Sequence, residues 1–326
     1  MRTTSRAAYL GRILSVYLRP ASGPLAFWYE TPESNDAAFQ RGIGQYYMTF
    51  AGKAEYRGPF DLAGVPLLDY RGDIGRQYNP IAIAQYGLAC FNHVRHDSRQ
   101  RWRDAYLRAA NWLTANLVPN VHGVPVWTHA FDWPYRQTLV APWYSGLAQG
   151  QGLSLLVRAA TDTGQTRYAD AADRAFRALT LEVAAGGVIV TDSEGRVWIE
   201  EYIVDPPTHI LNGFIWALWG VFDYMTWRGD ASARALFERC VDTLEGNLSR
   251  YDAGFWSLYE LNDDGPAMLA SPYYHRLHIV QLRVLERMTG RACFGAVAKR
   301  WAAYRSRRVF RVRALAQKAW FKLRRY

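Results

Sequence analysis

The helical periodicity of this sequence falls into pairs of segments, and this pairing constrains the fold more than any other feature. The two partners of a pair are separated by a short turn signal, as at Gly164-Gln165, Gly229-Asp230 and Gly290. Longer connections, rich in Gly, Pro and aromatic residues, separate one pair from the next. The expected pairs are 79–94 with 98–117, 142–163 with 166–184, 206–227 with 230–249, and 271–289 with 291–306.

About four helical hairpins of similar length predict a mainly α chain folded as an α/α toroid, in which inner and outer helices alternate. A solenoid of helical repeats is the competing architecture, but the sequence shows no residue-level repeat. In a toroid the long connections 118–141, 185–205 and 250–270 converge on one end and form a cleft there. A β-hairpin is expected as an insertion near 187–201, where two apolar runs flank a polar turn.

The chain divides into three regions by composition. Residues 1–75 comprise an expected amphipathic helix over 1–20, then a Gly- and Pro-rich stretch with short aromatic runs such as 45–50. That stretch predicts strands, a hairpin and an extended loop. Residues 76–304 form the expected catalytic toroid, and residues 305–326 form a basic amphipathic tail.

The net charge of +10 comes almost entirely from the tail, which carries nine Lys or Arg and no acid, so that 30 basic and 29 acidic residues remain elsewhere. Overall charge therefore does not identify the ligand of the body. The tail is either a solvated extension or an interfacial helix that docks on anionic lipid. Nucleic acid is disfavoured as a partner because no recognised binding module accompanies the tail. Self-association as a homodimer stays open.

The cysteines and histidines predict neither a disulfide framework nor a metal site. Three widely spaced cysteines, Cys90, Cys240 and Cys293, suit buried thiols in a reducing compartment. His275 and His278 lie three residues apart on an expected helix, but no third metal ligand accompanies them. We therefore expect these histidines to serve as hydrogen-bonding groups.

The N-terminal segment does not have the pattern of a signal peptide, because arginines interrupt its apolar residues over 1–20. No run approaches the roughly 18 apolar residues that a membrane span requires. We expect a cytoplasmic protein, held on the inner membrane surface if the tail binds lipid.

Several segments are too unusual for generic helices: RQYNPI at 76–81, PWYSG at 142–146, QGQG at 149–152, EEY at 200–202, LNGF at 211–214 and YH at 274–275, followed by His278. Together and in this order they resemble the C-terminal domain of the D-glucuronyl C5-epimerases, which turn glucuronate into iduronate in heparan-type chains. The resemblance runs from about residue 45 to residue 304. It implies an isomerase with an α/α-barrel domain. Animal members also carry a β-barrel, for which this chain has too few residues before 76.

Epimerisation at C5 of a uronate needs a base on one face of the sugar, an acid on the other, and groups that hold the developing carboxylate charge. It needs no redox cofactor. A Glu and a Tyr suit the two faces if burial brings their pKa values together. The resemblance implies that Glu201 and Tyr202 form the catalytic Glu-Tyr, and that Tyr274 and Tyr259 are further catalytic tyrosines. Neighbours in an extended chain point to opposite sides, so only one of Glu201 and Tyr202 is expected to be central.

The remaining candidate residues are expected to bind an acidic polysaccharide along the cleft. Trp143 and Tyr144 would form platforms on which sugar rings stack. The full set is Arg76, Gln77, Tyr78, Asn79, Trp143, Tyr144, Gln149, Gln151, Asn212, His275, Arg276 and His278.

One segment departs from the family pattern. Animal members carry an Arg close after the motif that contains Tyr259, where this chain has Asn-Asp-Asp at 262–264. Arg276 is the candidate replacement for a cation that grips the substrate, and Arg76 and Arg136 are the other candidates.

Two other functions are compatible with this sequence. A uronate lyase or glycoside hydrolase on the same fold is one; a hydrolase needs a second carboxyl, for which Asp132, Asp205 and Glu260 are the candidates. A non-catalytic glycan-binding protein is the other. The expected function is a polysaccharide uronyl C5-epimerase that converts D-glucuronate to L-iduronate.

Overall fold

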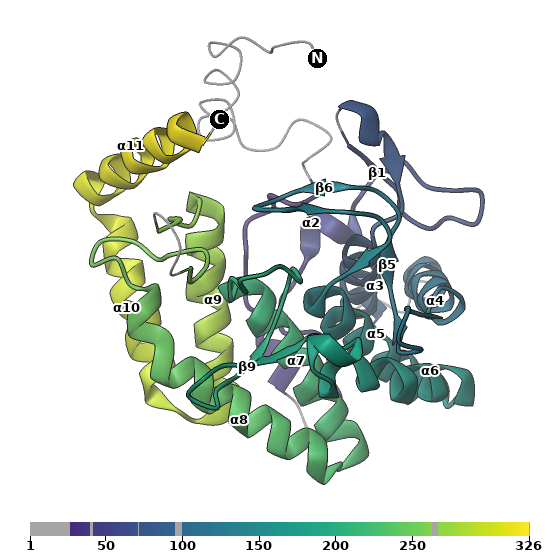
Figure 1. The fold of residues 1–326 in the computed structure, drawn as a ribbon. Coiled ribbons are helices and arrows are strands. Elements are labelled where there is room, and N and C mark those ends of the chain that lie inside the picture. The colour runs from purple at the N-terminus through teal and green to yellow at the C-terminus, as the bar shows by residue number, and fades with distance from the viewer. Residues whose placement is uncertain (1–26, 40–41, 71, 95–99, 263–266, 326) are drawn as a thin grey trace.

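The computed structural model describes residues 27–39, 42–70, 72–94, 100–262 and 267–325. Its main feature is the expected series of antiparallel helix pairs (Figure 1). The expected helix at 1–20 lies outside the described residues. The pairs are α3 (Pro80–Val94) with α4 (Gln100–Ala115), α5 (Gly146–Thr163) with α6 (Thr166–Phe176), α7 (Leu211–Arg228) with α8 (Ala231–Asn247), and α9 (Pro272–Thr289) with α10 (Ala292–Ser306).

The first helix of each pair forms an inner layer, and the second covers it. Helix α5 packs against both α3 and α7, and α7 packs in turn against α9. Almost every residue of α3, α5 and α7 is buried, which explains why these helices are apolar on all sides. Helices α4 and α6 instead bury one face, because their other side meets water. The predicted α/α toroid is confirmed.

Glycines end the first helix of three pairs and allow the chain to reverse. Gly164, Gly229 and Gly290 have φ values of 68°, 65° and 70°, which is the left-handed region that favours glycine. Each donates its backbone N–H to a carbonyl of the preceding helical turn. The turn signals of the sequence thus predict these reversals correctly.

Helices α5 and α7 approach each other so closely that their backbones touch. A Cβ atom added at Gly150 would lie 2.4 Å from Cα of Ala217, and one added at Gly220 would lie 2.3 Å from the carbonyl oxygen of Gly150. Any side chain at either glycine would therefore push the two helices apart.

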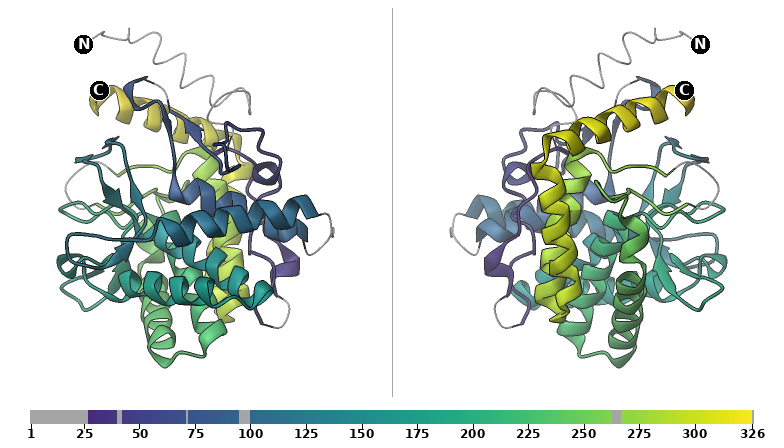
Figure 2. Two further views of the ribbon diagram at one scale, coloured as in Figure 1. Left: turned by 90° about the vertical axis from the view of Figure 1, so that its right-hand side faces the viewer. Right: turned by 90° about the vertical axis from the view of Figure 1, so that its left-hand side faces the viewer.

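Most of the short antiparallel strand pairs lie in the connections between helix pairs, which gather on one side of the helices (Figure 2). The predicted hairpin near 187–201 is confirmed as β9 with β10. The strands are β1 (Leu68–Asp69) with β2 (Arg76–Gln77), β3 (Val118–Pro119) with β4 (Pro125–Val126), β5 (Thr128–His129) with β8 (Trp143–Tyr144), β6 (Trp133–Pro134) with β7 (Thr138–Leu139), and β9 (Ile189–Thr191) with β10 (Val197–Ile199). The short helix α2 (Ala51–Ala54) and the 3-10 turns η1 (Asp36–Phe39), η2 (Gly72–Ile74), η3 (Arg177–Thr180), η4 (Val183–Ala185) and η5 (Leu248–Tyr251) complete the order.

The expected helix start at 142 is wrong, because Trp143 and Tyr144 pair with β5 instead. The helix begins after Ser145, whose side chain accepts a hydrogen bond of 3.0 Å from the N–H of Ala148 and so caps the first turn. The start expected at 206 is also too early, since α7 begins at Leu211.

Residues 27–39 and 42–50 form a largely irregular segment that contacts α3, α7 and α9. The Asn92 side chain accepts from the N–H of Tyr46 at 2.7 Å, and the hydroxyl of Tyr47 donates to Asp223 at 2.6 Å. The strand expected at 45–50 is reduced to one bridge, between Ser34 and Met48. The adjacent residues Tyr46 and Tyr47 are both buried in the core, whereas neighbouring side chains of a strand point to opposite faces. The hairpin predicted before residue 76 corresponds to β1 with β2, whose second strand, Arg76–Gln77, lies just beyond the expected stretch.

The basic tail contains helix α11 (Arg308–Arg325), which follows α10. In the part of the chain that the structure describes, we find no helix with the length and apolar character needed to cross a bilayer.

Candidate active site

Glu201 lies just after strand β10, with only 4% of its surface exposed. The side-chain amide of Asn212, in the first turn of α7, donates a hydrogen bond of 3.1 Å to its Oε2 atom. Gly213, the residue after Asn212, has no side chain and so leaves room for the carboxyl. A Cβ atom added at Gly213 would lie 2.2 Å from Oε2 of Glu201. In the LNGF segment, Asn212 therefore binds this carboxyl and Gly213 makes room for it.

Burial raises the pKa of Glu201 to about 8, and hydrogen bonds from Tyr202 and Asn212 oppose this rise. A carboxyl with such a pKa can both take up and release a proton near neutral pH. The hydrogen bond from Tyr202 also corrects the expectation that Glu201 and Tyr202 point apart. The chain bends directly after β10 instead of continuing as a strand, so both side chains reach the same site.

Three tyrosines surround this carboxyl. The rings of Tyr259 and Tyr274 lie 4.9 Å apart between centroids, and burial together with the charge of Glu201 raises the pKa values of Tyr202, Tyr259 and Tyr274 well above the usual range. All three phenols therefore keep their protons at neutral pH. The structure thus brings together the four side chains expected to be catalytic, although they come from two connections and from the first turn of α9.

Backbone contacts fix two of the tyrosines. The carbonyl of Tyr259 accepts from the N–H of Leu211 at 3.0 Å, which joins this loop to the start of α7. Tyr274 lies in the first turn of α9, where the hydroxyl of Ser271 accepts from its N–H at 3.2 Å. Both tyrosines are therefore positioned by the N-terminal ends of inner helices.

A second polar group contacts this cluster. The Tyr135 hydroxyl donates to the carboxylate of Glu260, which is 1% exposed, and Arg136 donates its Nε–H to the same carboxylate at 2.7 Å. The Tyr135 ring lies 4.8 Å from that of Tyr202. Sequence reasoning missed Tyr135, since it stands in a polar hairpin with no motif around it.

Aromatic side chains form one wall of the site. Trp143 stacks on His129 with ring centroids 3.8 Å apart and meets the edge of Tyr202 at 5.7 Å. Tyr144 points elsewhere and packs on the small cluster around Val126. Of the two expected sugar platforms, Trp143 is therefore the one that contacts the catalytic cluster.

The segment 76–79 contributes one side chain to this wall. Asn79 donates to the hydroxyl of Tyr70 at 2.7 Å. Arg76 pairs with Asp69, Gln77 bonds to the carbonyl of Ile74, and Tyr78 bonds to Asp61. Arg76 and Gln77 thus make contacts close to their own hairpin, and Tyr78 also packs on the ring of Trp112 in α4 at 5.4 Å between centroids.

The two expected glutamines lie inside the helical layer. Gln149 accepts from the backbone N–H of Trp127 at 2.9 Å, and Gln151 accepts from Gln85 at 3.0 Å. Both are fully buried. These bonds link α5 to the connection before it and to α3.

His275 and His278 share one partner, the hydroxyl of Ser257, at 2.8 Å and 3.0 Å. Burial lowers the pKa of His275 to about 4 and that of His278 well below the usual range, so both rings are neutral. Among the described residues, no group of three or more His, Cys, Asp or Glu could hold a metal ion.

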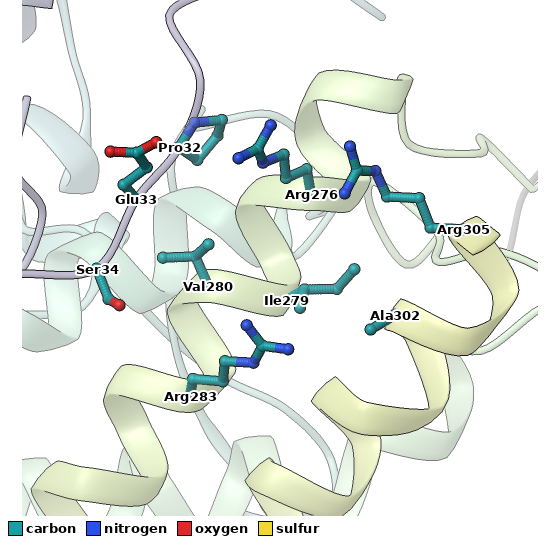
Figure 3. A pocket seen from close by; sticks show the side chains of 9 residues that line it. All are labelled: Pro32, Glu33, Ser34, Arg276, Ile279, Val280, Arg283, Ala302 and Arg305. Atoms are coloured by element: carbon teal, nitrogen blue, oxygen red, sulfur yellow. The ribbon is translucent and has the colours of Figure 1, made fainter.

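Arg276 lies on the other side of α9 from Tyr274, because two helical residues differ by about 200° in direction. It lines a separate open cavity of about 390 Å³, together with Arg283 and Arg305 (Figure 3). The structure thus keeps Arg276 apart from the Glu201 cluster.

The family described as D-glucuronyl C5-epimerase C-terminus matches residues 123–303. A D-glucuronyl C5-epimerase of Caenorhabditis elegans is 30% identical over 225 residues, which cover 63% of this chain and 36% of that protein. An uncharacterized protein of Methanocaldococcus jannaschii is 27% identical over 245 residues, 70% of this chain and 78% of that one. A solved unsaturated glucuronyl hydrolase from Bacillus sp. GL1 has 15% identity and a TM-score of 0.47, over 69% of this chain and 62% of that one.

Proposed function

This chain belongs to the family of the D-glucuronyl C5-epimerase C-terminus, and from this premise we propose that it is a uronyl C5-epimerase of an acidic polysaccharide. It converts D-glucuronate residues to L-iduronate by moving the C5 hydrogen to the opposite face of the sugar ring. The observation that carries this proposal is the buried carboxyl of Glu201, with a pKa of about 8, among three protonated phenols.

Glu201 is the proposed base. The hydrogen on C5 lies next to the sugar carboxylate and is a weak acid, so a carboxylate with a raised pKa removes it more readily than an ordinary one. When Glu201 takes this proton, the electron pair of the C–H bond passes into the carboxylate of the sugar. The intermediate is planar at C5 and can accept a proton from either face.

Tyr274 is the proposed acid, because its phenol keeps its proton and it comes from a different helix from the base. It donates a proton to C5 from the opposite face, which leaves Glu201 protonated and Tyr274 as a phenolate. Tyr259 stabilises that phenolate by a hydrogen bond. Proton exchange with solvent restores both groups, and the reverse reaction uses the same groups in exchanged roles.

The developing charge on the sugar carboxylate needs a positive partner. Arg136 is a cation that contacts the site, through Glu260 and Tyr135, with 14% of its side chain exposed. We assign it the role of holding the sugar carboxylate, in place of the cation that the segment 262–264 lacks. Trp143 supplies an aromatic face for a sugar ring.

The test is incubation of the full chain with heparosan, an unsulfated glucuronate polymer, in deuterated water, followed by NMR. We expect deuterium at C5, appearance of iduronate, and unchanged polymer length. Ultraviolet absorbance from an unsaturated product would instead identify a lyase, and new reducing ends would identify a hydrolase. Binding of the polymer without any exchange would identify a non-catalytic glycan-binding protein.

A further inference from the structure

Helix α11 docks on the body of the protein by one face only. Phe310 lies 6.3 Å from the ring of Phe255, and Ala314 is 6% exposed. Lys318 donates to the carbonyl of Leu269 at 2.8 Å. These contacts recur every four residues, so they fix which side of the helix faces the loop 252–262 and the start of α9.

The opposite side of α11 carries an apolar stripe. Val309, Val312 and Leu315 are 74%, 65% and 39% exposed, and their spacing of three residues places them side by side. Among the described residues, most of the surface of Val309 and Val312 stays uncovered, and Leu315 is partly covered. Clustered exposed apolar residues on one helix face indicate a surface that meets something other than water.

Arginines flank this stripe. Arg305, Arg308 and Arg311 are exposed, and none forms an ion pair with a residue that the structure describes. Arg276 and Arg311 lie close enough to Arg305 to repel its charge. Arg305 and Arg311 line one shallow cavity, which adjoins the cavity of Figure 3.

The adjoining cavity extends the positive surface onto α9. Arg276 and Arg283 line it together with Arg305, and their guanidinium groups surround an apolar floor that includes Ile279 (Figure 3). Glu33 is an acid at its edge, and it makes no ion pair with these arginines. The region from α9 to α11 therefore combines several cations with exposed apolar side chains.

We propose that this α11 surface, formed by Val309, Val312 and Leu315 with Arg305, Arg308 and Arg311, docks on an anionic lipid bilayer. The apolar stripe enters the headgroup region, and the arginines contact lipid phosphates. A soluble polyanion would satisfy the arginines alone and would leave the stripe in water. The bilayer satisfies both, and this is why we choose it as the occupant.

The test is sedimentation of the full chain with vesicles of phosphatidylcholine, with or without phosphatidylglycerol, in about 0.1 M salt. We expect the protein to pellet only with the anionic vesicles. One cation near such a surface contributes about fivefold in binding, equivalent to about 1 kcal/mol. Arg308→Glu with Arg311→Glu should therefore weaken binding by at least about 25-fold.

Two further variants separate charge from apolar contact. Val309→Ser with Val312→Ser leaves the charge unchanged and should weaken binding by about tenfold, through lost apolar burial. Arg234→Glu with Arg239→Glu is the matched control. It makes the same charge change at exposed positions of α8, on the far side of the molecule from α11 (Figure 1), and should bind like the parent. Circular dichroism checks that each variant folds.

Three outcomes would overturn the proposal. The parent could stay in the supernatant with anionic vesicles. The α8 control could lose as much binding as the α11 variant, which would reveal attraction by net charge alone. Binding could also be unaffected by the serine variant and be competed by soluble heparosan, which would make the surface a polysaccharide site.

Discussion

Two buried carboxylates near the same helix differ in how their charge is compensated. Asp223, in the middle of α7, is fully buried; it pairs with Arg158 at 2.6 Å and accepts from Tyr47 at 2.6 Å. Glu201, next to the start of α7, forms no ion pair with a described residue and accepts from the amide of Asn212. Burial of a charge is unfavourable in both places. The paired group joins α5, α7 and the N-terminal segment, whereas the unpaired group stays able to exchange a proton.

The largest expected effect is on activity. Glu201→Gln should lower deuterium incorporation at C5 by about 10³-fold, because the amide cannot take up the proton. The matched control is Glu200→Gln, which makes the same change at the adjacent residue, also buried but bonded to His209 at 2.5 Å. This control should keep its exchange rate within about tenfold. Equal losses in both variants would remove the special role of Glu201.

The next effect is on stability. Arg158→Met should lower the free energy of unfolding by about 3–5 kcal/mol, because it leaves Asp223 buried without its partner. Urea denaturation measures this. Replacing both partners, as Arg158→Met with Asp223→Leu, should recover much of the loss. If the single variant were as stable as the parent, the pair would not be what holds these elements together.

The two carboxylates should also differ in how stability depends on pH. The pKa of Glu201 is about 8 when folded and about 4.5 when unfolded, so the folded state binds more protons between these values, and stability falls as pH rises through that window. Glu201→Gln removes this loss. The variant should gain on the order of 2 kcal/mol over the parent between pH 5 and pH 7. A constant difference, measured by urea denaturation at both pH values, would contradict the raised pKa.

The smallest expected effect is on the pH dependence of the reaction, and it tests the hydrogen bond that Asn212 donates to Glu201. Because the base must be ionised, kcat/KM for exchange should rise with pH through about 8. The amide of Asn212 opposes the rise in that pKa, so Asn212→Ala should move the rising limb upward by roughly one pH unit. A pH–rate profile of both proteins measures this shift. An unchanged limb would mean that this bond does not tune the base.

The helical framework was predictable because its signals are local. A helical period and a glycine at each reversal fix a hairpin without knowledge of the rest of the chain, as at Gly164 and Gly229. The start of α5 was not predictable in this way. Trp143 and Tyr144 fit a helical pattern, but in the structure they pair with Thr128 and His129 of β5, which lie earlier in the chain. A local pattern does not contain that information.

The site was predictable only in part, for a similar reason. The family motifs identified Glu201 and the tyrosines, which the structure places together. The hydrogen bond between Tyr135 and Glu260 joins residues 125 positions apart, and a local sequence pattern cannot predict such a contact. The chain also bends after β10, so Glu201 and Tyr202 do not point to opposite sides as neighbours in a strand would.

The contact between Gly150 and Gly220 has a consequence for how this protein can change. Main-chain atoms, and not interchangeable side chains, set the separation of α5 and α7. The helical axes therefore stay where they are when side chains elsewhere on α5 and α7 change. Asn212, in the first turn of α7, then keeps its place, and with it the amide that bonds to Glu201.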